Sequence, residues 1–307
     1  MRVSFDAIIV GGGPAGASCA VWLRRLGLAP LLVEAGSLLG GLANDNPFRD
    51  DWIAVLPGAT GQQVAANIDR SVRAAGVELR LGVAAARAVA APEGFEVELE
   101  TGEIARGRTL VIASGVRPRY PDEDACRARE GRGRQPAAPP PGVLVGPGVA
   151  IAGQDFSGRS VAILGGGDNA FENHGYVLGR GARLAHIYAR TVRAQRQWIQ
   201  CVPPADVRAG PYRADIRART VNGQAYDLML VFYGWVPQAA FADGLDLRRD
   251  ARGHIWTDPA TAETSAPGVY AAGEVAGRMH PCVVTSLADG IVAAKAIQAR
   301  IEAGQPG

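Results

Sequence analysis

Short apolar runs that end at glycine alternate along this chain with longer segments of mixed polarity. Two of these runs, residues 8–10 and 161–164, each lead into a glycine-rich turn, and each turn opens a segment that we expect to be helical. Short apolar runs bounded by glycine are typical of strands buried on both faces of a parallel sheet. The pattern therefore predicts an α/β fold with two strand–turn–helix units about half the chain apart.

The first turn, Gly11–Gly16, has the glycine spacing of a dinucleotide-binding turn. Gly11 permits a tight exit from the strand, Gly13 lets the backbone approach a pyrophosphate, and Gly16 lets the helix pack against the strand. Glu34 ends the next apolar run about 20 residues further on, where a carboxylate accepts hydrogen bonds from a ribose. A strand–helix turn without a ligand is the alternative, and the order of strand, turn, helix and acid disfavours it.

The second turn repeats the spacing with Gly165, Gly167 and Ala170, since alanine is a permitted third small residue. The next strand is expected at residues 183–188. The position that corresponds to Glu34 of the first unit is Tyr188, which is not an acid. The second unit therefore lacks the carboxylate that favours an unphosphorylated ribose.

Two arginines, Arg190 and Arg193, follow the second predicted strand of this unit. Guanidinium groups can hold a 2′-phosphate bidentately, so this pair favours NADPH over NADH. The alternative is that both arginines lie on a solvated loop, because arginine is common throughout the chain.

The remaining pattern predicts two Rossmann-like dinucleotide-binding domains, one inserted into the other. The segment 117–148 is rich in proline and glycine without helical or strand periodicity, so we expect a long connector there. The C-terminal segment is expected to return to the first domain. Further strands are predicted at residues 76–82, 95–100, 110–115, 228–233 and 268–274, and a final helix at 283–301. The predicted first domain comprises residues 1–115 and 250–307, and the second comprises residues 116–249.

Charge and cysteine content narrow the classes of function. The 307 residues carry a net charge of only +2, and the basic stretch 127–134 also contains an acid and glycines, so no nucleic-acid partner is predicted. No apolar run is long enough to cross a bilayer, and the first strand leaves no room for a signal peptide, so we expect a cytoplasmic protein without a membrane partner. The four cysteines are too widely spaced to predict a disulfide framework or a metal site. They are Cys19, Cys126, Cys201 and Cys282.

This order of motifs resembles the thioredoxin reductase-like flavoproteins, a branch of the two-dinucleotide-binding oxidoreductases, over nearly the whole chain. The Gly11–Gly16 turn with Glu34 is similar to the family's FAD site, and residues 268–274 are similar to its ribityl-binding motif. Residues 284–286 resemble the opening of its last helix, whose N-terminal end faces the flavin ring. The resemblance implies FAD in the first domain, NADPH in the second, and a homodimer.

Carried over residue by residue, the resemblance implies one set of contacts for each cofactor. The set implied for FAD is Gly11, Gly13, Pro14, Ala15, Gly16, Glu34, Ala35, Gly41, Leu42, Ala113, Ser114, Gly115, Gly273, Glu274, Val283 and Val284. The set implied for NADPH is Gly165, Gly167, Asp168, Asn169, Ala170, Glu172, Arg190 and Arg193.

Three departures from the family pattern bear on function. Counted back from Gly165, the two cysteines of the family's redox dithiol fall on Gly148 and Ile151, which cannot take part in thiol–disulfide exchange. Glu274 replaces an aspartate, and the arginine spacing after the second strand is altered. The sequence therefore predicts that the chain is not an ordinary thioredoxin reductase.

Cys282 and His280 are the candidate catalytic residues, because the resemblance places them near the flavin. A helix N-terminus favours a thiolate at Cys282, and His280 could donate a proton to reduced flavin or to a substrate. An ordinary helix lead-in and a solvent-facing histidine are the simpler interpretations.

The leading hypothesis is an FAD-dependent NAD(P)H oxidoreductase without a dithiol, which passes electrons to an acceptor that the sequence does not specify. A ferredoxin or flavodoxin reductase is one alternative, although its usual C-terminal extension is not found here. A non-catalytic flavin-binding module or sensor, with a degenerate or repurposed second site, is the other. Flavin bleaching by NADPH separates the enzyme from the module.

Overall fold

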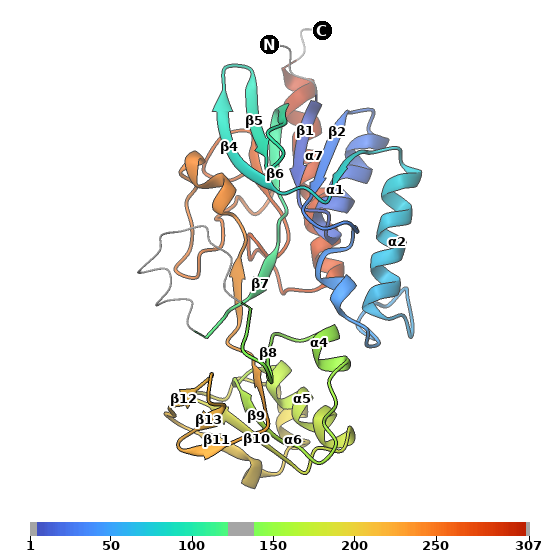
Figure 1. The fold of residues 1–307 in the computed structure, drawn as a ribbon. Helices are drawn as coiled ribbons and strands as arrows, with labels where there is room; N and C mark the ends of the chain where they lie inside the picture. Colours follow the sequence, from blue (N-terminus) through green and yellow to red (C-terminus); the bar gives the residue numbers. More distant parts are fainter. Residues whose placement is uncertain (1–4, 122–137, 305–307) are drawn as a thin grey trace. The chain divides into compact units, whose positions relative to one another are not determined.

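The computed structural model describes residues 5–121 and 138–304 and divides the chain into two compact units (Figure 1). The first unit comprises residues 1–117 and 236–307, and the second comprises residues 118–235. The first unit is thus made from both ends of the chain. Cys126 and the basic stretch 127–134 lie outside the described residues.

The first unit contains a seven-stranded mixed sheet in the order β3-β2-β1-β6-β5-β4, with β17 also paired to β6. The strands β3, β2, β1, β6 and β17 pair in parallel, whereas β4 and β5 form an antiparallel hairpin that continues onto β6. The bounds are β1 Phe5–Val10, β2 Pro30–Glu34, β3 Glu78–Leu81, β4 Ala85–Ala91, β5 Gly94–Leu99, β6 Ile104–Ile112 and β17 Val269–Ala271.

Alternation along β1 explains the layers of this unit, since successive strand residues point to opposite faces. Ile9 faces the helices, whereas Ile8 and Val10 face a second core that includes the hairpin. The helices that cover this face contribute to the same core as Ile9, and Figure 1 shows them on one side of the sheet. They are α1 Pro14–Arg25, α2 Gly61–Ala74 and α7 Val283–Ala303. Two 3-10 turns, η1 Gly41–Asp45 and η3 Ala240–Leu245, complete the unit.

The second unit has a five-stranded sheet in the order β11-β10-β9-β15-β8, in which every pair is parallel. Ile163 faces the core beneath α5, and Ala162 and Leu164 face a second core that contains Tyr188 and Tyr226. The sheet strands are β8 Val143–Val145, β9 Ser160–Leu164, β10 Leu184–Ala189, β11 Val207–Ala209 and β15 Leu228–Val231. The helices are α4 Val149–Ala152, α5 Asp168–Gly179, α6 Arg196–Gln200 and the 3-10 turn η2 Pro204–Asp206.

Three shorter strands form a small antiparallel sheet in the second unit, and two more strands pair with each other. The small sheet consists of β12 Ala214–Asp215, β13 Thr220–Val221 and β14 Gln224–Ala225. The two-stranded pair consists of β7 Val116–Pro118 and β16 Trp235–Pro237.

The strands and helices predicted around both turns are confirmed. The prediction of an irregular connector over 117–148 was wrong where the structure describes its ends, because Val143–Val145 forms β8 and pairs with β15. The rest of that segment, residues 122–137, lies outside the described residues. The sequence pattern also missed α2, which a capping box of Thr60 and Gln63 begins, and β4.

Candidate dinucleotide sites

The first turn leaves strand β1 in a conformation that glycine alone tolerates well. Gly11 has φ +110°, and a Cβ placed on it would collide with the carbonyl group of Ala113. A Cβ on Gly16 would collide with the carbonyl oxygen of Gly11, so the helix can lie against the strand here only with glycine. These are the two geometric tasks that the sequence assigned to these glycines.

The N-terminus of α1 has no side-chain cap and is partly exposed. Gly13 is its N-cap, Pro14 follows it, and no side chain caps the first turn of the helix. A Cβ on Gly13 would meet only Gly41 Cα, at 3.8 Å. Uncapped amides and the positive end of the helix dipole make this position a ready anion site, so the residues fit a pyrophosphate group.

Glu34 stands at the end of β2 beside this turn. Its Oε2 accepts a hydrogen bond from Gly12 N at 2.6 Å, and its Oε1 accepts one from Gly36 N at 2.7 Å. These two bonds fix the direction of the carboxylate. Because a carboxylate can accept about four hydrogen bonds, acceptor capacity is left for ribose hydroxyls.

Two further predicted FAD segments converge on the first turn. Gly40 N donates to Gly12 O at 2.8 Å, and this bond places Gly41 and Leu42 at the turn. Ala113 N donates to Val10 O at 2.8 Å, which places the residues 113–115 against Gly11. These two predicted segments therefore lie together with the first turn at the carboxyl ends of β1 and β6.

Gly273 joins the same cluster from the C-terminal part of the chain. It has φ +76°, and a Cβ on it would lie 3.0 Å from the Cβ of Ala15 in α1. Its N–H donates to Asp289 Oδ2 in α7 at 3.1 Å. Glu274 follows directly and is half-buried, and burial raises the pKa of its carboxyl above the ordinary value.

The sequence reasoning missed a buried ion pair that supports Gly273. Arg278 and Asp289 lie with their side chains only 7% and 3% exposed, and Arg278 Nε is 3.1 Å from Asp289 Oδ1. The Arg278 guanidinium also donates to Thr257 Oγ1 at 3.2 Å and to the backbone oxygens of Asp258 and Pro259 at 2.6 and 2.8 Å. The signal in the sequence was an aspartate among the apolar positions of the last helix.

A second missed residue supports the segment 114–116. Gln238 N donates to Gly115 O at 3.0 Å, and its side-chain amide donates to Ser114 O and Val116 O at 3.3 and 3.4 Å. The Ser114 hydroxyl in turn donates to Gln238 O. No local sequence pattern marks Gln238, because all of these partners lie more than 100 residues away in the chain.

The candidate catalytic residues lie at the start of α7. Cys282 is the N-cap, and its Sγ accepts a hydrogen bond from Thr285 N at 3.4 Å. The Thr285 hydroxyl donates to His280 O at 2.7 Å, and the side chains of His280 and Cys282 are exposed. Val283 packs against the core of the first unit, whereas Val284 is exposed.

The second turn repeats the geometry of the first in the other unit. Gly165 has φ +150°, and a Cβ on it would lie 2.6 Å from Phe232 O. Gly167 is the N-cap of α5, no side chain caps that helix, and a Cβ on Gly167 would meet nothing within 4 Å. Ala170, in the first turn of α5, is fully buried. The α5 terminus therefore also fits a phosphate group.

Some polar residues predicted at the second site are hydrogen-bonded within the protein, whereas the two arginines are exposed. The carboxylate of Asp168 accepts two hydrogen bonds from Gln195, and Asn169 O accepts one from Asn173. Arg190 and Arg193 are both exposed. The guanidinium carbon of Arg190 lies 5.9 Å from the centre of the Tyr212 ring.

Tyr188, which the residue count placed at the ribose position, is buried in the sheet core. Its hydroxyl lies 2.7 Å from that of Tyr226, which lies 2.7 Å from His186 Nδ1. Arg208 Nη2 is 3.3 Å from His186 Nε2. Because arginine only donates, His186 Nε2 accepts, and Nδ1 carries the proton and donates to Tyr226. Tyr188 thus belongs to a buried polar network rather than to a ribose site.

Within the described part of the chain, the carboxyl groups with a clearly raised pKa are Glu172 and Glu274, and both belong to the predicted cofactor sets. Desolvation raises the pKa of Glu172, and the nearby charge of Asp168 raises it further. Burial raises the pKa of Glu274. Perturbed carboxyl groups cluster at functional sites, so this observation supports both locations.

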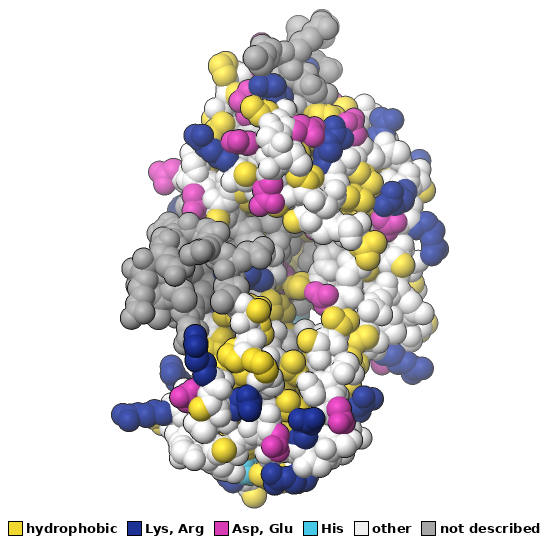
Figure 2. Space-filling view, viewed as in Figure 1, with side chains coloured by type: hydrophobic (Ala, Val, Ile, Leu, Met, Phe, Trp, Pro, Cys, Tyr) yellow, Lys and Arg dark blue, Asp and Glu magenta, His cyan; other side chains and the backbone are white. Residues whose placement is uncertain are grey.

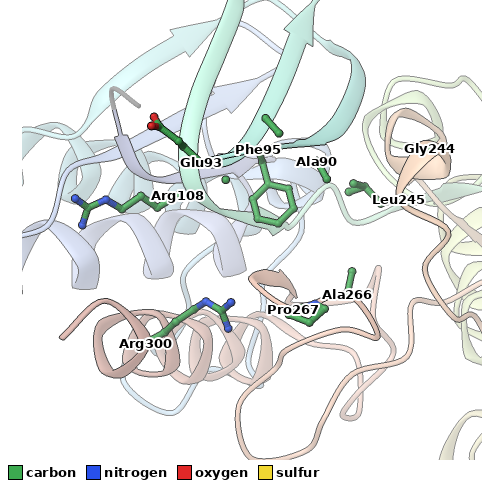
Figure 3. Close-up of a pocket in the computed structure, with 11 residues that line it drawn as sticks. Ala90, Glu93, Phe95, Arg108, Gly244, Leu245, Ala266, Pro267 and Arg300 are labelled. Atoms are coloured by element: carbon green, nitrogen blue, oxygen red, sulfur yellow. The ribbon is translucent and has the colours of Figure 1, made fainter. Parts of the chain in front are cut away.

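A separate hollow of about 530 Å³ lies in the first unit, away from the glycine turns. Figure 3 shows Phe95 from the hairpin and Arg300 from α7 at this hollow. Arg300 is already paired with Glu263 at 3.1 Å, and Arg108 lies 3.5 Å from Asp6. The hollow therefore offers no unpartnered guanidinium to a ligand.

The surface, the helices and the possible metal ligands of the described residues add three observations. On the face shown in Figure 2, acidic and basic side chains lie interspersed among uncharged and apolar ones. None of the helices in residues 5–121 and 138–304 combines the length and apolar character that a bilayer crossing requires. In the same residues, no three His, Cys, Asp or Glu side chains are grouped so as to hold a metal ion.

Comparison with protein families gives two matches. Residues 9–64 match the family model of the NAD(P)-binding Rossmann-like domain, and residues 193–290 match that of the pyridine nucleotide-disulphide oxidoreductases. Among curated proteins, the chain is 27% identical over 320 aligned residues to an NADH dehydrogenase of Bacillus subtilis. It is 26% identical over 317 residues to a subunit of the alkyl hydroperoxide reductase of Pseudomonas aeruginosa. Each alignment covers 94% of this chain but only 57% of the relative.

Solved structures share the fold at low sequence identity. Thioredoxin reductase of Lactococcus lactis superposes with a TM-score of 0.78 at 22% identity, covering 98% of this chain and all of that one. Bacillithiol disulfide reductase of Staphylococcus aureus gives 0.77 at 17% identity, covering 99% of this chain and all of that one. The predicted α/β fold with two dinucleotide-binding units is confirmed.

Proposed function

Because the chain resembles the thioredoxin reductase-like, two-domain flavoproteins in fold and in its two glycine turns, we propose that it is an FAD-dependent NAD(P)H oxidoreductase. The first unit would bind FAD and the second would bind the nicotinamide cofactor. When bound, FAD supplies the centre that accepts a hydride and passes electrons on. NADPH as the donor and a homodimer as the assembly are further parts of this proposal.

The single observation that carries the proposal is the pair of uncapped helix N-termini, one in each unit. Each helix follows a parallel strand, and the first glycine after that strand, Gly11 or Gly165, has no room for a Cβ. The N-cap glycine of each helix, Gly13 or Gly167, does have room for one. Two such sites in one chain fit two nucleotide cofactors. A single-cofactor binding module needs only one of them.

The chain's own residues would bind and orient the two cofactors. Glu34, held by Gly12 and Gly36, would accept hydrogen bonds from the adenosine ribose of FAD. Glu274 would hold the ribityl chain from a loop that Asp289 fixes through Gly273. In the second unit, the amides at the start of α5 would bind the phosphates of the nicotinamide cofactor.

We propose that the electrons leave without a dithiol of the thioredoxin reductase type. Gly148 is the N-cap of the short helix α4, with φ +125°, and Ile151 is buried in that helix. Neither residue carries a sulfur atom that could attack a disulfide. Cys282, the exposed N-cap of α7, and His280 beside it would be the groups at the flavin edge.

An anaerobic titration with NADPH and then NADH, followed by flavin absorbance, tests the proposal. We expect one of them to bleach the flavin at equivalent amounts. Gly167→Ala should abolish bleaching while FAD stays bound, because the added methyl group meets no protein atom within 4 Å and can only obstruct a ligand. Gly175→Ala, which also meets nothing within 4 Å but lies further along α5, is the matched control.

Gly13→Ala tests the first site in the same way. Its Cβ makes only an ordinary contact with Gly41, so the ligand-free protein should melt like the parent but lose FAD. Bound FAD that neither nicotinamide cofactor reduces, although dithionite does, would contradict the proposal and indicate a binding module.

A further inference from the structure

The loop after β10, residues 190–195, carries both exposed arginines and is fastened to the second glycine turn at two places. Arg193 N donates to Gly166 O at 2.6 Å. Gln195 donates to both oxygens of Asp168, from its backbone N and its side-chain Nε2, at 2.7 Å each. The backbone of Thr191 also lies so close to Gly166 that a Cβ there would collide with it.

Asp168 occupies the first turn of α5, next to the position at which phosphate groups would bind. A carboxylate stabilises a helix N-terminus, but it would repel an approaching phosphate. The two bonds from Gln195 engage both carboxylate oxygens and direct them toward the loop. Asp168 therefore connects the phosphate turn to the arginine loop instead of pointing freely into the site.

We propose that Gln195, acting through Asp168, is a positioning residue that sets the preference of the second site for a 2′-phosphorylated adenosine. The inference rests on the proposed function, since it concerns the nucleotide site of the second unit. Arg190 and Arg193 have no carboxylate partner among the described residues. The fastened backbone places both arginines, at Arg193 through its bond to Gly166, and the guanidinium of Arg190 also lies near the Tyr212 ring.

Glutamine suits this position for a chemical reason. Its neutral amide donates to a carboxylate without adding charge beside the phosphates. Glutamate at the same position would set two carboxylates face to face and release the loop. Alanine would remove the side-chain bond alone and keep the bond from the backbone N–H.

Calorimetric binding of adenosine 2′,5′-bisphosphate and of 5′-AMP tests the inference without any redox step. We expect the parent protein to bind the bisphosphate at least about tenfold more tightly, which is the factor of one charged hydrogen bond. Gln195→Ala should reduce that preference severalfold and leave 5′-AMP binding unchanged. Gln195→Glu should abolish the preference and should weaken 5′-AMP binding less than bisphosphate binding, because the released Asp168 and the added carboxylate repel the 5′-phosphate of both ligands. Gln197→Ala, an exposed position on the neighbouring helix α6, is the matched control.

Several results would overturn the inference. The parent protein could show no preference for the bisphosphate, or both Gln195 variants could keep the parent's preference. Equal losses of affinity for the bisphosphate and for 5′-AMP would mark Gln195 as a merely structural residue. Failure of the proposed function looks different. The bisphosphate preference would then depend on Gln195 as expected, while neither NADPH nor NADH bleached the flavin of the parent protein.

Discussion

Replacing Arg278 with methionine removes the positive charge from a buried ion pair that joins three segments of the first unit. The guanidinium contacts Asp289 on α7, and it also contacts the side chain of Thr257 and two backbone oxygens of the next residues. Asp289 in turn accepts the N–H of Gly273, beside the proposed ribityl-binding Glu274. The pair therefore supports the loop that would hold the flavin.

The expected loss of folding stability follows from the burial of both side chains. Both side chains are less than a tenth exposed, so solvent screens neither charge. Removing one partner of such a pair costs about 3–5 kcal/mol, because the other charge stays buried. Arg278→Met and Asp289→Leu should each lower the melting temperature by roughly 10 °C for a unit of this size. The double variant leaves no unpaired buried charge. It loses the acceptor of Gly273 N and the guanidinium's bonds to Thr257 Oγ1 and to the backbone oxygens of Asp258 and Pro259, each at a cost of about 1 kcal/mol.

Urea unfolding of the four proteins, followed by far-UV circular dichroism, measures the coupling as a double-mutant cycle. We expect a coupling free energy of at least about 3 kcal/mol. Arg73→Met is the control, because its pair with Asp69 is exposed at 53% and 28% and solvent screens it, so its loss should change stability far less. A double variant that loses the full sum of the two single losses would refute the reasoning.

Three further predictions concern single positions. Glu274→Gln should stabilise the FAD-free protein at neutral pH and make no difference below the ordinary carboxyl pKa of 4.5. The reason is that burial raises the pKa of Glu274 in the folded state and penalises only the ionised form. Melting curves across pH check this, and an equal effect at all pH values would contradict it. Thr60→Ala removes one half of the capping box of α2 and should cost about 1 kcal/mol in urea unfolding, whereas no loss would show that the cap is redundant. Gly16→Ala should unfold the first unit or shift α1, because its Cβ would collide with Gly11 O, and a parent-like melting curve would exclude this.

The parts of the fold that the sequence predicts are those with local causes. The sequence pattern of a parallel strand that ends in a glycine turn is contained within about ten residues, so β1, β9 and the helices after them were predictable. The strand β8 was not, because Val143–Val145 is a strand only through its pairing with β15, more than 80 residues later. Pairing over that distance leaves no local pattern in a proline-rich segment.

The candidate sites divide in the same way. Gly13, Glu34 and Gly167 were predictable from spacing, since their geometry depends on one turn and one strand. The residue count showed that Tyr188 stands where the first unit has Glu34, but only the fold shows that its side chain points toward the core that contains Tyr226. The supporting residues Gln195, Gln238 and Asp289 were missed because each acts on a partner that only folding brings near.

The first and last helices of the described chain are pressed against each other. A Cβ on Gly290 of α7 would collide with Ala15 O of α1, and β17 completes the sheet beside β6. On the ribosome, the N-terminal strands therefore emerge long before the residues that cover them, while the second unit is synthesised as one continuous stretch. From this order of synthesis we expect the second unit to finish folding first and the proposed flavin site to be assembled last.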